Sequence, residues 1–299
     1  MRIGAFEVQE PVPDLHAPHA LSMLRPWVDV GSVGSLTLRR LERHYEAREL
    51  AKLARPGVFF DFTRYRPTTR LVDGKRETTT PNMTVRYAQP ESGPNLLFLH
   101  MLEPHTMAED YIDSIVDLLK YFKVSVYGRV GAMYDSVPHT RPVVITGNSG
   151  PIEPRPGATS PLIQQRQSQY QGPTSIMNVV TDTATQLGIG TMNFMAHLPH
   201  YAQLERDHTA TARMLQVLSA YYEFPASLAL NRRGEEQYRQ LDSAVEQNRQ
   251  LKAAIVELEA HYDAAYGSST EQKPTPELSP EIEQFLRDLD TGTQGPTAS

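Results

Sequence analysis

Three short polar segments hold the side chains of this sequence that are best suited to chemistry. They are HMLEPHT (100–106), PHTR (138–141) and HLPHY (197–201), and together they contain five of the ten histidines. Imidazole transfers protons near neutral pH and is also a common metal ligand. Prolines at 138 and 142 hold the central segment extended, because proline fixes its own φ and restricts the preceding residue. The segments therefore predict either a functional site or a rigid corner.

One interpretation is acid–base catalysis. His139 would be the general base, held by Glu103, and Arg141 would bind a carboxylate or phosphate of the substrate. The alternative, which we take as the first expectation, is that these side chains brace the rim of the sheet. Arg141 would then bond loop carbonyls or a carboxylate such as Glu103 or Asp135. The catalytic candidates, if the protein is an enzyme, are Glu103, His105, His139, Arg141 and His200.

A metal or cofactor is not expected. His197 and His200 are separated by a proline-containing loop rather than a helical turn, no H-E-x-x-H motif occurs, and the chain has no cysteine. The ligand spacing of the common metal sites is therefore missing. Neither a G-x-S-x-G elbow nor a G-x-x-x-x-G-K-[ST] phosphate loop is present.

A glycine-rich turn, DVGSVGS (29–35), is a further position where a ligand could bind. It follows a short predicted strand, WVDV (27–30), and precedes a predicted helix whose N-cap would be Ser35. The G-x-G-x-x-G spacing of dinucleotide sites is incomplete, so a turn that needs small residues for packing is the alternative. The ligand-binding candidates are Asp29, Gly31 and Gly34.

The elements that must position these segments predict an α/β fold. Strands alternate with amphipathic helices, which predicts a mostly parallel central sheet flanked by helices, with ligand sites at the strand ends. The remaining predicted strands are GVFFDFT (57–63), NLLFLHML (95–102), VSVYGRV (124–130) and IGTMNFMAHLPHY (189–201). Asp73-Gly74 predicts a hairpin turn whose second strand would be NMTVRYAQ (82–89). Helices are predicted over 103–124, 175–188 and 207–222, and the first has a Thr106/Glu109 capping box. A further, short helix is predicted within 162–170.

The last quarter of the chain changes composition. We expect an α/β core domain over 1–225, a helical extension over 226–290 and a disordered tail over 291–299. Residues 235–266 predict one long helix with a heptad-like apolar seam, which would pack on the chain's own core or on a second copy. The seam residues are Leu241, Ala244, Asn248, Leu251, Ile255, Leu258 and Tyr262. A short helix is predicted over 279–289.

Composition narrows the class of protein. The chain has 299 residues and a net charge of −6, so a duplex-binding surface is not expected. No secretory signal and no apolar run of about 18 residues is visible. We therefore expect a cytoplasmic protein that binds neither nucleic acid nor membrane.

Several of these segments, in this order, resemble a known family. The resemblance runs from about Leu24 to about Leu289 and rests most on VPHTRPV (137–143) and HLPHY (197–201), with FFDFTRYRP, LLFLHMLEPHT and YQGPTSI beside them. The chain resembles the proteasome assembly chaperone 2 family in its prokaryotic form, and EIEQFLRDL (281–289) is similar to the end of actinobacterial-type members.

The resemblance implies a phosphorylase/hydrolase-like α/β domain with a helical C-terminal extension, and a homo-oligomer, plausibly a trimer. Eukaryotic relatives help to assemble the 20S proteasome. No catalytic role comes with the family motifs. The chain ends Pro296-Thr297-Ala298-Ser299 rather than in a hydrophobic residue, a tyrosine and one more residue, so docking of this end into a proteasome pocket is not expected. The first expectation is a non-enzymatic, assembly-chaperone-like protein with a protein client, and the alternative is a small-molecule hydrolase or phosphorylase-type enzyme.

Overall fold

The computed structural model describes residues 1–158, 163–164, 172–266 and 284. The strands are β1 (Arg2–Ile3), β2 (Phe6–Val8), β3 (His19–Arg25), β4 (Arg48–Leu53), β5 (Thr68–Val72), β6 (Lys75–Thr79), β7 (Thr84–Ala88), β8 (Leu96–Leu102), β9 (Val126–Asp135), β10 (Ile145–Asn148), β11 (Ile163–Gln164) and β12 (Gly190–Pro199). The helices are α1 (Val33–His44), α2 (Ala108–Tyr121), α3 (Ile176–Gln186), α4 (His208–Ser219), α5 (Arg232–Glu246) and α6 (Arg249–Tyr266), with short 3₁₀ turns η1 (Val30–Ser32), η2 (Pro56–Val58) and η3 (Ala226–Ala229). The α/β prediction is confirmed.

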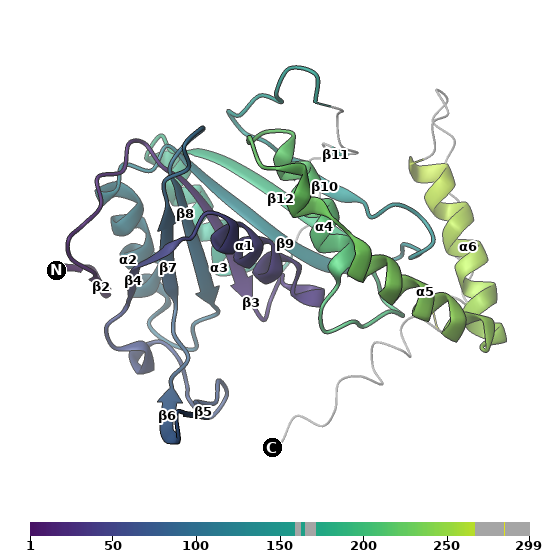
Figure 1. Cartoon of the computed structure of the whole chain (residues 1–299), viewed down its shortest axis with the longest axis horizontal. Coiled ribbons are helices and arrows are strands. Elements are labelled where there is room, and N and C mark those ends of the chain that lie inside the picture. Colours follow the sequence, from purple (N-terminus) through teal and green to yellow (C-terminus); the bar gives the residue numbers. More distant parts are fainter. Residues whose placement is uncertain (159–162, 165–171, 267–283, 285–299) are drawn as a thin grey trace.

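A single ten-stranded sheet forms the centre of the fold, in the order β1-β2-β4-β7-β8-β3-β9-β12-β10-β11 (Figure 1). Its middle strands β8, β3, β9 and β12 are parallel to one another. By contrast, β1, β2, β4 and β7 pair antiparallel up to β8, and β10 runs antiparallel to β12. The prediction of a mostly parallel sheet was therefore wrong, and the sheet is mixed. Short connections such as β7 to β8 lack a crossover helix, and antiparallel pairing follows from that.

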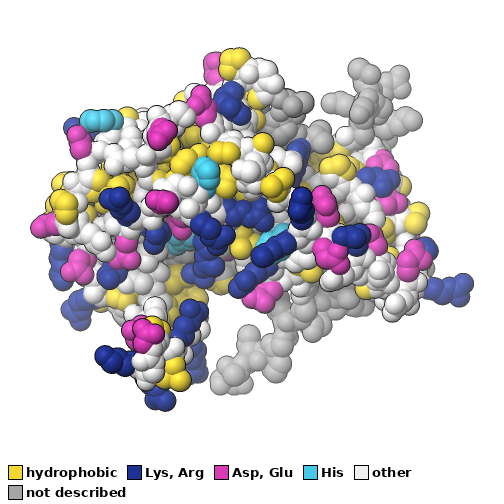
Figure 2. All heavy atoms as spheres, viewed as in Figure 1, with side chains coloured by type: hydrophobic (Ala, Val, Ile, Leu, Met, Phe, Trp, Pro, Cys, Tyr) yellow, Lys and Arg dark blue, Asp and Glu magenta, His cyan; other side chains and the backbone are white. Residues whose placement is uncertain are grey.

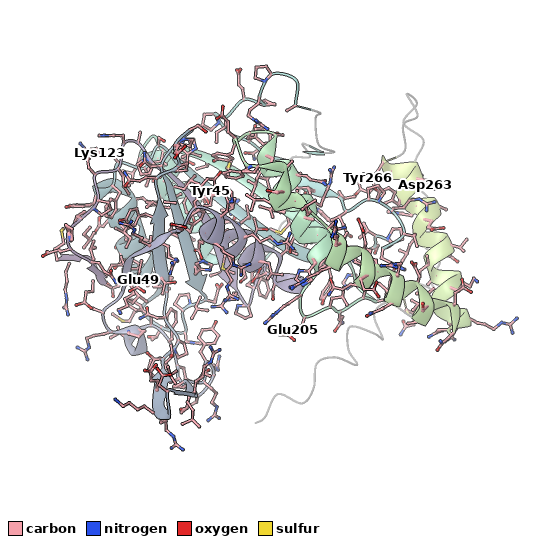
Figure 3. The ribbon with its side chains drawn as sticks, viewed as in Figure 1. Tyr45, Glu49, Lys123, Glu205, Asp263 and Tyr266 are labelled. Carbon is pink, nitrogen blue, oxygen red and sulfur yellow. The ribbon has the colours of Figure 1, made fainter. Side chains whose placement is uncertain are left out.

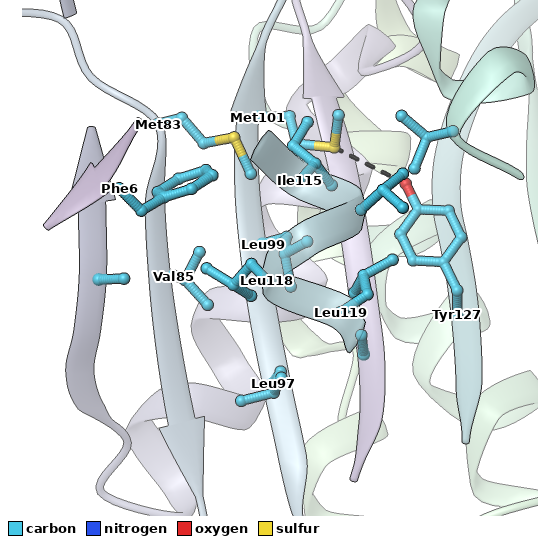
Figure 4. Packing of buried hydrophobic residues seen from close by; sticks show 14 of the residues in the cluster. Phe6, Met83, Val85, Leu97, Leu99, Met101, Ile115, Leu118, Leu119 and Tyr127 are labelled. Atoms are coloured by element: carbon cyan, nitrogen blue, oxygen red, sulfur yellow. Dashed lines mark hydrogen bonds between the residues drawn. The ribbon is translucent and has the colours of Figure 1, made fainter. Parts of the chain in front are cut away.

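Helices cover both faces of the sheet. Strand β8 is buried throughout, and its side chains alternate between two cores. Leu97, Leu99 and Met101 pack under Ile115, Leu118 and Leu119 of α2 (Figure 4). Leu96 and Phe98 face the opposite core, which holds Leu38 and Leu41 of α1 and Leu215 and Leu218 of α4. A strand buried on both faces reads as a continuous apolar run, which is why β8 was predictable.

The region before β8 differs most from the prediction. Residues 27–30 form a turn in which Trp27 is exposed, and the strand is β3, just before Pro26. Residues 57–63 contain η2 and a turn rather than a strand, since Pro56 starts a helical turn that buries Phe59 and Phe60. The Asp73-Gly74 hairpin exists, with φ of 50° and 76°, but it joins β5 to β6, and β7 pairs in the main sheet instead. Strand β4 was missed.

Helix ends also differ in detail. Ser32, not Ser35, is the N-cap of α1, and Met107 rather than Thr106 precedes α2. The long helix over 235–266 is two helices, because Asn248 breaks it and accepts hydrogen bonds from the amides of Gln250 and Leu251, both at 3.1 Å. The seam is thus interrupted, and its second half, Ile255, Leu258 and Tyr262, is buried within the chain.

Three predictions fall largely or wholly outside the described residues. They are the helix in 162–170, the helix in 279–289 and the disordered tail over 291–299. Where the structure is described, no helix is long and apolar enough to cross a membrane.

Candidate functional site

The polar segments predicted from the sequence do follow the parallel strands. Strands β8, β3, β9 and β12 end at the same edge of the sheet, and residues 103–106, 136–144 and 200–206 continue from three of those ends. In α/β sheets this carboxyl edge is where ligands bind. The side chains along it nevertheless form separate groups, each with its own partners.

The end of β8 carries the first group. Glu103 is half-buried, and burial raises the pKa of its carboxyl while a backbone hydrogen bond from Ile176 lowers it. The Tyr65 hydroxyl donates to the Glu103 carbonyl at 3.1 Å. His105 is exposed, and its Nδ1 accepts from the Asp61 amide at 3.1 Å. The contacts of this group go to Ile176 and to the segment 59–65, so Glu103 does not hold His139 as predicted.

Two pockets open beside this group. The larger, of about 660 Å³, has walls from the ends of β3 and β8 and from the β5–β6 hairpin, and its lining is Arg25, Arg64, Tyr65, Arg66, Thr68, Arg70, Thr79, Thr80, Pro81, Asn82, Thr84 and Leu102. The smaller, of about 410 Å³, is lined by Gly57, Phe60, Asp61, Arg64, His105 and Thr106. Local sequence patterns did not indicate either pocket, because their walls come from four separate stretches of the chain, at 25, 57–70, 79–84 and 102–106.

His139 lies in the second group, in the loop after β9. It is buried, and its Nδ1 lies 2.7 Å from the Tyr201 hydroxyl while its Nε2 lies 3.0 Å from Asp242 of α5. The Tyr201 oxygen also accepts from the His139 amide at 2.8 Å, so its hydrogen is free to point at Nδ1. The partners thus fit a neutral ring that donates from Nε2 to the carboxylate. Burial lowers the pKa of His139 although Asp242 raises it.

Arg141 clamps α6 to the same loop. Its Nε and Nη2 donate to the two carboxylate oxygens of Asp263 at 2.8 and 2.7 Å, and its Nη1 donates to Glu259 at 2.9 Å. Figure 3 labels Asp263 on α6. The hydrogen bonds from Arg141 to these carboxylates raise the pKa of the guanidinium. A clamp to a carboxylate was predicted correctly, but Glu103 and Asp135 were the wrong partners.

Asp135 instead belongs to a third group with His197 and Thr146. Asp135 Oδ2 lies 2.7 Å from His197 Nδ1, and His197 Nε2 lies 2.8 Å from Thr146 Oγ1. Burial would raise the pKa of Asp135, but the hydrogen bond and charge of His197 lower it overall. The candidate His200 packs its ring against Tyr134 at 5.5 Å. Asp135 and Thr146 lie in the stretch that contains PHTR, yet their approach to His197 depends on β9, β12 and β10 being neighbours.

The glycine-rich turn packs α1 against the sheet. Asp29 is buried and accepts from the Ser35 hydroxyl at 2.6 Å and the Ser35 amide at 3.1 Å. Gly31 has a φ of 59°, and a Cβ there would lie 2.8 Å from Leu198 and 2.9 Å from Asp207. At Gly34 a Cβ would lie 2.8 Å from the Val130 carbonyl. Within the described ranges, no group of three acidic or histidine side chains could hold a metal ion.

Comparison with known proteins identifies the family. Residues 23–245 match the profile of the PAC2 family. The chain belongs to the PAC2 family. The resemblance seen in VPHTRPV and HLPHY is therefore confirmed, and the matched region includes both segments. No protein with a curated description matches the sequence.

Three solved structures that are similar to this PAC2 protein come from actinobacteria. A Mycobacterium tuberculosis protein of unknown function has 23% identity and a TM-score of 0.74, and the similarity covers 89% of this chain and 90% of that one. A PAC2 family protein of Streptomyces avermitilis has 23% identity and a TM-score of 0.67, covering 81% and 99%. A proteasome-assembly chaperone homologue of M. tuberculosis has 22% identity and a TM-score of 0.67, covering 79% and 99%. At these identities the likeness shows the fold.

The burial of His139 predicts a pH dependence for the stability of the PAC2 protein. Because the folded-state pKa lies below the ordinary value of about 6.5, the unfolded chain binds more protons as the pH falls. The stability that comes from keeping His139 neutral is thus fully present above about pH 6.5, and it is lost as the pH falls toward the pKa of His139 in the folded protein. His139→Gln keeps a donor and an acceptor, so we expect a shallower loss between pH 7.5 and 5.5.

Urea unfolding at several pH values measures this effect. His19 and His208 also have pKa values lowered by burial, so the wild type and the variant will share part of the slope. The difference between the two slopes isolates His139. Parallel slopes would show that His139 titrates alike in the folded and unfolded chain.

Proposed function

We propose that this PAC2 protein is a non-enzymatic, assembly-chaperone-like protein that works as a homo-oligomer and contacts a protein client. The observation that carries the proposal is the PAC2 match over 23–245, together with a similar structure described as a proteasome-assembly chaperone homologue. The predicted catalytic residues support it further. His139 and Arg141 are engaged in holding α5 and α6, whereas Glu103 and His105 contact the segment before the hairpin.

The β5–β6 hairpin supports self-association. It projects from the sheet, every residue of its strands is exposed, and Leu71 and Val72 near its tip are 76% and 43% exposed (Figure 1). A two-stranded hairpin alone is at best marginally stable in water. Apolar residues at its tip are therefore best explained by a partner surface, which a second copy would supply.

Light scattering on the purified protein tests the proposal. We expect the wild type to have at least twice the mass of the 33.6 kDa chain. Leu71→Asp should lower the mass toward one chain, since a carboxylate would be buried at the interface. Leu230→Asp is the matched control, because Leu230 is 65% exposed and lies outside the hairpin. A monomeric wild type at micromolar concentration would remove the homo-oligomer from the proposal.

The client is tested separately. Affinity capture of the tagged full chain from its native cells, followed by mass spectrometry, should return stoichiometric protein partners. Proteasome subunits among them would support a role in proteasome assembly, and their absence beside another stoichiometric partner would redirect the proposal to that client.

A hydrolytic enzyme is the second candidate, and one observation favours it. Asp135, His197 and Thr146 form a hydrogen-bonded chain in which an acid orients an imidazole next to a hydroxyl. That order of groups is the one that activates a hydroxyl nucleophile. Hydrolysis of p-nitrophenyl acetate, abolished by both His197→Ala and Thr146→Val, would favour the enzyme.

A further inference from the structure

The larger pocket is strongly basic, although the chain as a whole carries a net charge of −6. Four arginines line it: Arg25 from the end of β3, Arg64 and Arg66 from the segment before the hairpin, and Arg70 from β5. Figure 2 shows Lys and Arg side chains gathered over the projecting hairpin. An acidic protein that concentrates four guanidinium groups around one hollow brings like charges together, which is unfavourable unless an anion offsets them.

Among the described residues, no carboxylate forms an ion pair with any of the four guanidinium groups, and none of these groups donates a hydrogen bond, in contrast to Arg86 and Arg141. Asp29 and Asp61 influence Arg25 and Arg64 only at longer range. Glu77 lies opposite Arg70 in the hairpin register, but the two form no ion pair. By contrast, Arg141 binds two carboxylates of α6.

Arg25 is the arginine of this pocket that has a buried donor. It is half-buried at the end of β3, and its Nε is fully buried and has no hydrogen-bond partner among the described residues. Arg39 adds a second positive charge nearby. A buried guanidinium donor without an acceptor costs free energy, so such groups are normally paired. An acceptor that enters from the pocket would satisfy it.

The rest of the lining suits an oxygen-rich ligand of small size. Thr68, Thr80 and Thr84 offer hydroxyls, whereas Asn82 is already bonded to both backbone groups of Leu53 and serves as wall. A volume of about 660 Å³ lies within the range of small-molecule sites. Guanidinium groups match the oxygens of phosphate in pairs, and several of them together favour a ligand with more than one negative charge.

We propose that this pocket binds a small, multiply charged organic anion of the phosphate-ester or polyphosphate class. The juxtaposition of Arg25, Arg64, Arg66 and Arg70 around one hollow carries the proposal. Such a ligand would bridge the sheet edge, through Arg25, and the hairpin, through Arg70. This goes beyond the proposed chaperone function and does not depend on it.

Isothermal titration of the full chain with pyrophosphate and with ATP tests the proposal, and citrate is the carboxylate probe of similar charge. We expect pyrophosphate or ATP to bind, and Arg25→Gln and Arg66→Gln each to weaken the binding by about tenfold. Arg66 is exposed, so its variant should fold even if the Arg25 variant does not. Arg76→Gln is the control, since Arg76 pairs with Leu71 on the face of the hairpin opposite to Arg70.

The relative affinities of the probes and of the variants test both the ligand class and the location of the site. If pyrophosphate binds as tightly as ATP, the pocket recognises the phosphate groups. If ATP binds more tightly, the pocket also contacts the nucleoside. Citrate binding as tightly as pyrophosphate would overturn the phosphate class. The site itself would be overturned by equal loss of affinity in Arg76→Gln and Arg66→Gln, or by heats no larger than those from potassium chloride of the same ionic strength.

Discussion

Replacing Asp207 with alanine is expected to lower the free energy of unfolding by about 2–4 kcal/mol. Asp207 is 1% exposed, and its two carboxylate oxygens have different tasks. Oδ1 caps α4 by accepting from the Ala210 amide at 2.7 Å. Oδ2 accepts from the hydroxyl of Tyr238, on α5, at 3.0 Å. Losing an N-cap costs about 1 kcal/mol, and a stranded buried hydroxyl costs about 1–3 kcal/mol more.

Asp207→Asn tests whether the two hydrogen bonds or the negative charge of Asp207 stabilises the protein. Burial raises the pKa of the Asp207 carboxyl, so the ionised form is not favoured by its surroundings. Asparagine keeps one oxygen for the cap and offers a polar group to Tyr238, and we expect a much smaller loss. Urea unfolding of Asp207→Ala, Asp207→Asn and Tyr238→Phe gives the comparison. Equal losses for the alanine and asparagine variants would show that the carboxylate charge, not the hydrogen bonds, matters.

Asp207 also connects the glycine-rich turn to the helical region. Its amide donates to the Gly31 carbonyl at 2.8 Å, and its side chain occupies the space that a Cβ on Gly31 would need. The turn, the start of α4 and α5 therefore meet at one residue. Packing against Asp207 is therefore sufficient to explain why position 31 is a glycine, and no bound ligand is needed for that explanation.

The sequence predicted those elements whose pattern is long and regular. Helices α1, α2 and α4 each bury one face and therefore show a clear amphipathic periodicity. Strand β8 is buried throughout and therefore shows a continuous apolar run. Strand β4 was missed because its burial pattern is irregular and a register shift interrupts its pairing between Glu49 and Ala51. The break at Asn248 was missed because a side chain that caps a new helix can also be an ordinary polar position in a longer one.

The site was less predictable because its partners are far apart in the chain. Arg141 meets Asp263 and Glu259 across separations of 122 and 118 residues, and His139 meets Asp242 across 103. Spacing in the sequence identified Arg141 as a clamp but could not identify what it holds. The same limit hid the basic pocket, because Arg64, Arg66 and Arg70 lie within seven residues but Arg25 joins them only through the fold.

Tyr262→Ala is expected to loosen the docking of α6 on the rest of the protein. Tyr262 is 5% exposed, packs with Val137 and Val144, and donates its hydroxyl to the Pro142 carbonyl at 2.8 Å. Truncating a buried aromatic residue costs about 3–5 kcal/mol. The contacts that remain on α6 include the ion pairs of Arg141, which is 31% exposed, and partly exposed ion pairs are weak. Ile255 and Leu258 of α6 are also buried, so the loss should weaken the docking of the helix without removing every contact, while the sheet core stays folded.

Hydrogen exchange resolves this local effect from global unfolding. We expect amides of residues 249–266 to lose protection in Tyr262→Ala while those of α2, in the core, keep theirs. Val256→Ala is the matched control, because Val256 lies on α6 and is 60% exposed. Arg141→Ala and Arg141→Lys should reduce the protection of α6 less than Tyr262→Ala does, and the lysine variant should not restore it fully, since an ammonium cannot replace the planar fork. Unchanged protection of α6 in Tyr262→Ala would mean that contacts other than this anchor hold the helix against the loop after β9.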